Sequence, residues 1–117
     1  MSPNSLPRLL LAAGLASFLA PAPAAEEVVI RMTAKKFEYS QPTLVVKKGV
    51  PLVLEITALD RVHGFNLPDF GVRTDVLPGQ VRRIRLIPGK SGEFVFFCDV
   101  FCGDGHEQMS GVLTVKD

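Results

Sequence analysis

Residues 93–116 have the sequence EFVFFCDVFCGDGHEQMSGVLTVK, in which two apolar runs flank a loop of different chemistry. The runs 93–97 and 111–116 are rich in aromatic and β-branched residues, as short β-strands are. The loop between them, 98–109, contains both cysteines of the chain, one of its two histidines and one of its three methionines. If the two runs pair, the loop lies at one end of a rigid sheet, which is where binding residues usually lie.

The spacing in this loop is C-x3-C-x3-H-x2-M, which predicts a metal site. Thiolate, imidazole and thioether ligands favour copper over cations that prefer oxygen. Gly103 and Gly105 give the backbone the freedom that a tight loop needs. A loop alone cannot enclose a metal, so we expect a further ligand from His63, the only other histidine. The candidate ligands within the loop are Cys98, Cys102, His106 and Met109.

Simpler interpretations of the same residues remain open. In an oxidising compartment, two cysteines usually form one structural disulfide. A bridge that closes so short a loop removes little entropy from the unfolded chain, however, and it does not need His106, Met109 or His63. A single histidine more often hydrogen-bonds a backbone carbonyl than binds a metal. Only the incomplete ligand set of the loop favours a metal role for His63.

The N-terminal residues 1–24 have the features of a secretory signal peptide. Arg8 lies in a short initial region, an apolar segment follows at 9–20, and Ala-Pro-Ala at 22–24 fits a cleavage site. The apolar segment is shorter than the roughly 20 residues that a membrane-spanning helix needs. We therefore expect export to the periplasm and a mature domain at 25–117. The alternative is an uncleaved segment that tethers the domain.

The charge of the chain is nearly balanced, with 13 Lys+Arg and 12 Asp+Glu. Removal of Arg8 with the signal peptide would leave a mature domain of zero formal charge. Such a domain has no basic field that would attract nucleic acid, so a nucleic-acid partner is excluded. Pairs and triplets of basic residues are interpreted as solvent-facing. The small size and neutral charge are consistent with a monomer.

Short apolar or alternating runs recur through the mature domain, separated by turns with glycine and proline. In the run 51–58, Leu52, Leu54 and Ile56 share one face, which is the period of a half-buried strand. No segment has a helical period. The pattern predicts an all-β fold, an antiparallel Greek-key β-sandwich, with an irregular connection at 37–42 and a short strand after a loop in 60–68. The other expected strands are 27–34, 43–47, 51–58, 72–76, 81–87, 93–97 and 111–116.

Together these residues resemble the CuA cupredoxin domain of cytochrome c oxidase subunit II. The resemblance extends over about 37–115 and includes the turn Leu-Pro-Gly-Gln at 77–80. The matching motifs are His63-Gly64-Phe65, Gly92-Glu93-Phe94 and, above all, Cys98-x3-Cys102-Gly103-x2-His106-x2-Met109-x-Gly111. It implies a cupredoxin-like β-sandwich that binds two copper ions in a binuclear CuA centre.

The resemblance also implies a role for each ligand. Cys98 and Cys102 would bridge both coppers as thiolates. His63 and Met109 would complete one copper, and His106 with the backbone carbonyl of Val100 would complete the other. The implied function is electron transfer without catalysis, and the implied partner is a c-type cytochrome or a terminal oxidase or reductase. A copper delivery or storage protein and a mononuclear cupredoxin are the alternatives, although the second cysteine counts against a mononuclear site.

Three departures from the family pattern bear on function. Val100 stands where the family often has a glutamate that contributes to a magnesium site, so that contact is not expected here. The chain has no tryptophan for docking cytochrome c, and Phe65 is the aromatic residue expected to replace it. The two transmembrane helices of subunit II are absent from the sequence, which predicts a stand-alone exported relative.

Overall fold

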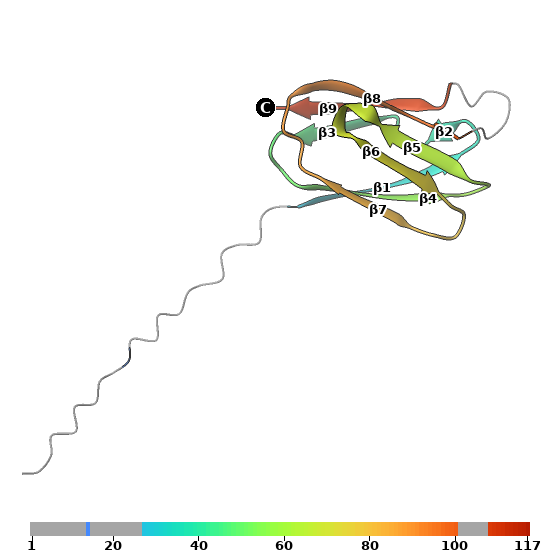
Figure 1. Ribbon diagram of the computed structural model, residues 1–117, viewed down its shortest axis with the longest axis horizontal. Helices are drawn as coiled ribbons and strands as arrows, with labels where there is room; N and C mark the ends of the chain where they lie inside the picture. Colours follow the sequence, from blue (N-terminus) through green and yellow to red (C-terminus); the bar gives the residue numbers. More distant parts are fainter. Residues whose placement is uncertain (1–13, 15–26, 101–107) are drawn as a thin grey trace, which may run out of the picture.

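The computed structural model describes residues 27–100 and 108–117, together with Gly14. Within these residues the chain forms nine β-strands and one short 3-10 helix, packed as two layers (Figure 1). No helix in the described part of the chain has the length and apolar character of a membrane-spanning segment. The elements are β1 (Val28–Lys35), β2 (Glu38–Tyr39), β3 (Thr43–Lys47), β4 (Leu52–Ala58), β5 (His63–Leu67), η1 (Pro68–Phe70), β6 (Val72–Val76), β7 (Arg82–Leu86), β8 (Gly92–Phe97) and β9 (Ser110–Lys116).

The described strands form one sheet with the order β2-β1-β4-β7 and a second with the order β3-β9-β8-β5-β6. This architecture confirms the predicted all-β sandwich, and the expected pairing of the runs before and after the loop is observed between β8 and β9. Each sheet, however, contains one parallel pairing, β1 with β4 and β3 with β9. Both sheets are therefore mixed. Each parallel pairing joins two strands between which the chain crosses to the other sheet and back.

The connection at 37–42, predicted to be irregular, contains the two-residue strand β2. Its residues pair with the end of β1, Ala34 opposite Tyr39 and Lys35 opposite Glu38. The tight reversal places Phe37 at a φ of 123°. Residues other than glycine rarely adopt this backbone conformation. The outcome is that Tyr39 points into the sandwich instead of lying in a surface loop, with 3% of its surface exposed.

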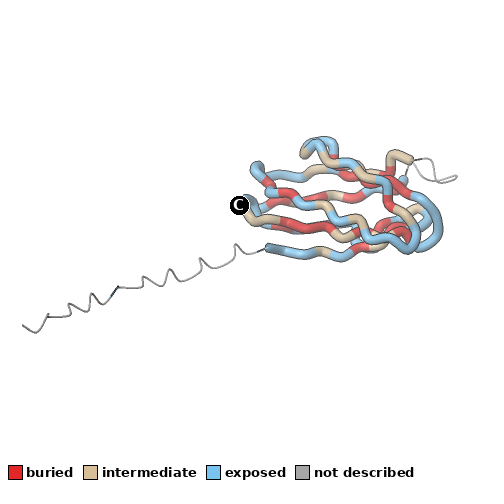
Figure 2. Tube along the Cα trace, turned by 60° about the horizontal axis from the view of Figure 1, so that its bottom comes forward, coloured by how far each residue is buried: buried red, intermediate tan, exposed pale blue. Residues whose placement is uncertain are grey.

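The core lies between the two layers, where the buried stretches face one another (Figure 2). Leu52, Leu54 and Ile56 are fully buried on β4, as their alternation predicted. At the centre, the rings of Phe65 and Phe96 lie 5.1 Å apart, and Tyr39 packs edge-on at 5.1 Å from Phe96. The expectation that Phe65 replaces a docking tryptophan is wrong, because this side chain is fully buried.

Candidate metal centre

The topology brings the sequence-predicted ligands to one end of the five-stranded sheet. Strand β5 begins at His63, and β8 ends at Phe97, directly before Cys98. The two strands are antiparallel, with Asn66 opposite Phe97. The start of β5 and the end of β8 therefore lie at the same end of the sandwich, which we call the ligand pole (Figure 1).

His63 is fully buried at the ligand pole, and its two ring nitrogens have different surroundings. Nε2 lies 2.6 Å from Oδ1 of Asp60. Nδ1 is buried and has no hydrogen-bond partner among the residues that the structure describes. A carboxylate that binds one imidazole nitrogen is the usual arrangement behind a histidine that ligates a metal through the other nitrogen. A buried nitrogen left without a partner is costly unless it binds something.

Asp60 is held in its charged form by the groups around it. Burial alone would raise the pKa of this carboxyl. The hydrogen bonds from His63 and from the backbone N–H groups of Lys36 and Arg61 outweigh that effect, and they lower the pKa of Asp60 to about 2. The carboxylate is therefore ionised at neutral pH, and it fixes the orientation of the His63 ring. The sequence analysis gave Asp60 no role, because its spacing from His63 matches no ligand motif.

Cys98 lies beside His63 in space, although 35 positions separate them in the chain. Its side chain is 3% exposed. The backbone N–H of Gly64 donates a hydrogen bond to Sγ at 3.3 Å, and the thiol donates to the carbonyl oxygen of Val100 at 3.2 Å. The peptide that follows His63 thus contacts the cysteine sulfur directly. These two hydrogen bonds fix the position of the sulfur between β5 and the segment that follows β8.

Gly64 permits this close approach. A Cβ at this position would collide with the Asp99 carboxylate and would lie 3.1 Å from both the Asp99 nitrogen and Cγ2 of Val100. Glycine, which lacks a side chain, therefore leaves room for both neighbours here. On its other side, the carbonyl of Gly64 accepts a hydrogen bond of 2.7 Å from the buried hydroxyl of Tyr39. The sequence analysis missed this bond, because the acceptor is a backbone atom far along the chain.

After the loop, the chain returns to the ligand pole at Met109, beside Cys98. Met109 is fully buried, and its carbonyl accepts a hydrogen bond of 3.0 Å from the backbone nitrogen of Cys98. Val100 is half-buried and packs against the core. The structure therefore brings together four of the six predicted site residues, namely His63, Cys98, Val100 and Met109. Cys102 and His106 lie outside the described residues.

Asp99, between two predicted ligands, has polar contacts of its own. Its carboxylate accepts hydrogen bonds from Nε of Arg73 at 2.7 Å, from Nη2 of Arg73 at 2.9 Å and from Nδ2 of Asn66 at 3.3 Å. The hydrogen bonds from Arg73, with that from Asn66, lower the pKa of Asp99 against the opposing effect of burial. No signal in the sequence links residues 73 and 99, because the contact depends on which strands are neighbours.

The described donors fit a copper ion better than a hard cation. They are an imidazole nitrogen, a thiol sulfur and a thioether, all within buried side chains, and copper accepts such ligands. Within residues 27–100 and 108–117, no group of three or more His, Cys, Asp or Glu side chains forms a metal site by itself. The loop spacing predicts Cys102 and His106 as further ligands, and both lie outside the described residues.

Comparison with known proteins gives the family. The profile of the family described as "Cupredoxin-like domain" matches residues 8–115. The chain belongs to this family. Copper is accordingly the metal that its membership implies, and the two-sheet sandwich with a ligand pole is the expected architecture of a cupredoxin.

Individual relatives of this cupredoxin are subunits of cytochrome c oxidase. The chain is 32% identical over 91 residues to cytochrome c oxidase subunit 2 of Thermus thermophilus, covering 78% of this chain and 67% of that protein. A second subunit 2 from the same species has the same identity, and there the chain spans 54% of the relative's length.

Solved structures show the same fold. The periplasmic domain of subunit II of cytochrome oxidase from Bradyrhizobium japonicum superposes with a TM-score of 0.71 at 24% identity, over 77% of this chain and 84% of that one. A subunit II captured as a mixed disulfide with the thioredoxin-like protein TlpA gives a TM-score of 0.67 at 23% identity, over 86% of this chain and 89% of that one.

Proposed function

We propose that this cupredoxin is an exported electron-transfer protein with a binuclear CuA-type copper centre, and that it carries electrons without catalysing a reaction of its own. The observation that carries the proposal is the buried Nδ1 of His63, which has no partner among the described residues and belongs to a peptide that contacts the sulfur of Cys98. A structural histidine would have both nitrogens satisfied. The loop spacing C-x3-C-x3-H-x2-M supports the same conclusion.

The proposed ligands are His63, Cys98, Cys102, His106, Met109 and the carbonyl of Val100. When bound, a copper pair would supply a one-electron couple whose charge change is shared by two metals. The protein contributes fixed ligand positions. Asp60 holds the His63 ring through Nε2, and the N–H of Gly64 holds the Cys98 sulfur in place. The aromatic residues Phe65 and Phe96 belong to the same buried cluster as Cys98 and Met109.

The location and partners follow from this function. We propose that residues 1–24 direct export to the periplasm and that the mature domain begins at residue 25. The redox partner would be a c-type cytochrome or a terminal oxidase or reductase. Because thiolates are needed for copper binding, a thioredoxin-like reductant is a second proposed partner. The mixed disulfide between TlpA and a subunit II of the same fold supports it.

The test is a copper titration of the reduced protein (residues 25–117), followed by EPR and visible absorption spectra of the same sample. We expect two coppers per chain that share one unpaired electron. One copper per chain with a single-metal EPR signal would replace the proposal with a mononuclear cupredoxin. Weakly held Cu(I) without a visible band would replace it with a copper delivery protein.

A further inference from the structure

Arg73 on β6 contacts the segment that carries two of the proposed ligands. The Arg73 side chain is 43% exposed, yet all three of its guanidinium nitrogens are engaged. Nε and Nη2 bind the two carboxylate oxygens of Asp99 at 2.7 and 2.9 Å. Nη1 binds Oδ1 of Asp75 at 2.7 Å. Such a planar, bidentate contact restricts the direction of a carboxylate, which a single hydrogen bond does not.

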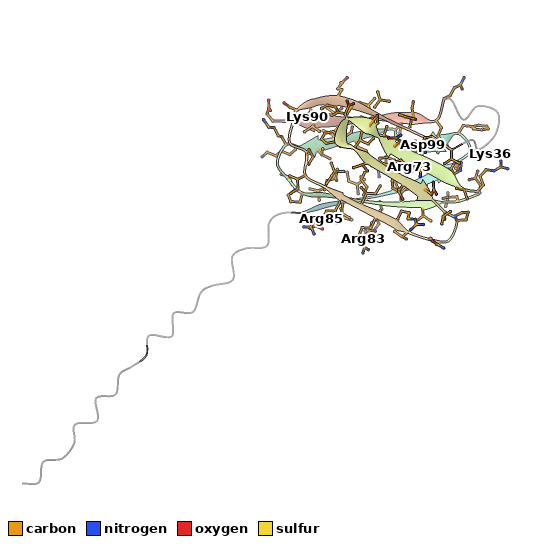
Figure 3. All side chains as sticks on the ribbon, in the orientation of Figure 1. Lys36, Arg73, Arg83, Arg85, Lys90 and Asp99 are labelled. Atoms are coloured by element: carbon orange, nitrogen blue, oxygen red, sulfur yellow. The ribbon has the colours of Figure 1, made fainter. Side chains whose placement is uncertain are left out.

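The sheet register produces this contact. Arg73 lies directly opposite Asn66 in the β5–β6 pair, and Asn66 lies opposite Phe97 in the β5–β8 pair. The three residues therefore form a row across the outer face of the sheet, and Asp99 follows two positions after Phe97. Figure 3 shows Arg73 and Asp99 side by side at this place. Asn66 adds its own hydrogen bond to the same carboxylate.

We propose that Arg73 is a positioning residue for the segment 98–100. Arg73 holds Asp99 in place, so that Cys98 and Val100 present their sulfur and carbonyl oxygen to the metal. The inference rests on the proposed copper centre. The Cys98 sulfur and the Val100 oxygen are 3.2 Å apart on either side of Asp99, so a rotation of the Asp99 backbone would separate them. The hydrogen bonds of Arg73 reach neither atom, and it acts only through the Asp99 carboxylate.

Lysine cannot replace Arg73 in this role. A lysine ammonium is a point charge on a flexible stem, and it cannot bind two oxygens of Asp99 and one of Asp75 in a fixed plane. The charge would be kept but the orientation would be lost. Arg73→Lys therefore separates the effect of charge from the effect of geometry.

Arg83 offers a matched control on the other sheet. It binds Oε1 of Glu55 through Nη2 at 3.1 Å and through Nε at 3.3 Å, so it also makes a surface pair with a carboxylate. Figure 3 shows it on the layer that does not carry the ligand loop. Arg83→Gln removes the same charge and the same type of contact without touching the loop.

The experiment compares wild type, Arg73→Gln, Arg73→Lys, Arg83→Gln and the double variant Arg73→Gln/Asp99→Asn, all loaded with copper. The rate of copper loss to a chelator, the EPR spectrum and the urea midpoint of the metal-free protein are measured. For Arg73→Gln we expect roughly fivefold faster copper loss, the most that a half-exposed ion pair usually contributes. Arg73→Lys should restore only a minor part of the difference, and the double variant should be no faster than Arg73→Gln alone.

Arg83→Gln should release copper at the wild-type rate, although its metal-free urea midpoint should shift as much as that of Arg73→Gln. Equal copper loss in Arg73→Gln and wild type, or equal acceleration in Arg83→Gln, would overturn the inference while leaving the copper centre intact. Full recovery in Arg73→Lys would also overturn it, because charge alone would then suffice. If wild type itself holds no copper pair, the proposed function fails first and the inference fails with it.

Discussion

His63 and Phe65 are two positions apart on β5, face the same side of the sheet and are both fully buried, but they meet opposite surroundings. Phe65 lies against the rings of Phe96 and Tyr39, at 5.1 and 6.1 Å. His63 keeps a buried ring nitrogen without a partner in the described chain. Two neighbouring positions on one face of β5 thus belong to a packed core and to a polar site.

The aromatic centre and the ligand pole therefore contribute differently to the stability of the fold. The aromatic centre is satisfied by packing and by the hydrogen bond from the Tyr39 hydroxyl to the Gly64 carbonyl, so it stabilises the fold with or without a metal. The ligand pole places polar atoms where burial is costly, and metal binding would recover that cost. A variant of the core should therefore affect unfolding first, and a variant of the pole should affect copper first.

The largest expected effect is on copper binding, from Cys98→Ser. Serine cannot supply a bridging thiolate, so the binuclear EPR and visible spectra should disappear completely. The metal-free protein should lose only about 1 kcal/mol of unfolding free energy, because the smaller hydroxyl can still hydrogen-bond the Gly64 N–H and the Val100 carbonyl. Urea denaturation and EPR of the same preparation measure both quantities. A binuclear spectrum that survives in this variant would refute the assignment.

Phe96→Ala should produce the largest loss of stability. This ring is fully buried between Phe65 and Tyr39, and its removal leaves a cavity. We expect a loss of about 3–5 kcal/mol in unfolding free energy, with or without copper. Phe97→Ala, the neighbouring residue on the outer face, is the matched control and should cost about 1 kcal/mol. Similar costs for both variants would contradict the observed facing of β8.

Gly64→Ala should affect both properties, because this residue lies where core and pole meet. The added methyl group would collide with the Asp99 carboxylate and would crowd Val100. We expect a loss of about 1–3 kcal/mol in unfolding free energy and faster copper release, since the loop must move away from His63. Gly89→Ala, whose added carbon meets no atom within 4 Å, should leave stability and copper release unchanged. Wild-type copper release from Gly64→Ala would argue against the close approach of the two segments.

The smallest expected effect is the pH dependence of the metal-free protein that Asp60 contributes. Its pKa is lowered to about 2 in the folded state from an ordinary value of 3.8. A lowered carboxyl pKa stabilises the fold above the ordinary value, and this stabilisation is lost as the pH falls from about 4 towards 2. Asp60→Asn lacks this contribution. The difference in unfolding free energy between wild type and Asp60→Asn should therefore shrink over this range, by an amount on the order of 1 kcal/mol because Asp60 is partly exposed.

Urea denaturation at several pH values measures this difference, and other carboxylates cancel because both proteins contain them. A difference that stays constant between pH 5 and pH 2 would show that the contacts of Asp60 do not hold its charge. Copper must be absent, because bound metal would add its own proton linkage.

The fold could be predicted from the sequence where local pattern determines structure. Alternation on β4 and the apolar run of β8 are local signals, and both strands were predicted nearly to their ends. The parallel pairings of β1 with β4 and of β3 with β9 could not be predicted. Strand order depends on how connections cross the sandwich, which no local pattern records. The strand β2 was missed because two residues are too few to show a period.

The same distinction applies to the candidate site. The ligands could be proposed from the sequence because their chemistry and spacing are unusual within one loop. The residues that support them, Asp60, Tyr39 and Arg73, are ordinary residue types whose partners are distant in the chain or match no motif. Asp60 and Tyr39 bind backbone atoms, and Arg73 reaches across β5 to Asp99, so only the three-dimensional arrangement reveals these contacts. Phe65 was assigned to the surface because a strand pattern does not say which of its faces is inward.

The position of β9 has a consequence for how the protein is made. This strand is the last in the described chain, but it lies between β3 and β8 inside its sheet. While the polypeptide emerges from a ribosome or a translocation channel, the sheet retains a gap until residues 110–116 are available. Met109 directly precedes this strand, so the ligand pole also closes last. Copper loading of the proposed centre would therefore follow synthesis of the whole domain, and a nascent chain stalled before β9 would expose two unpaired strand edges.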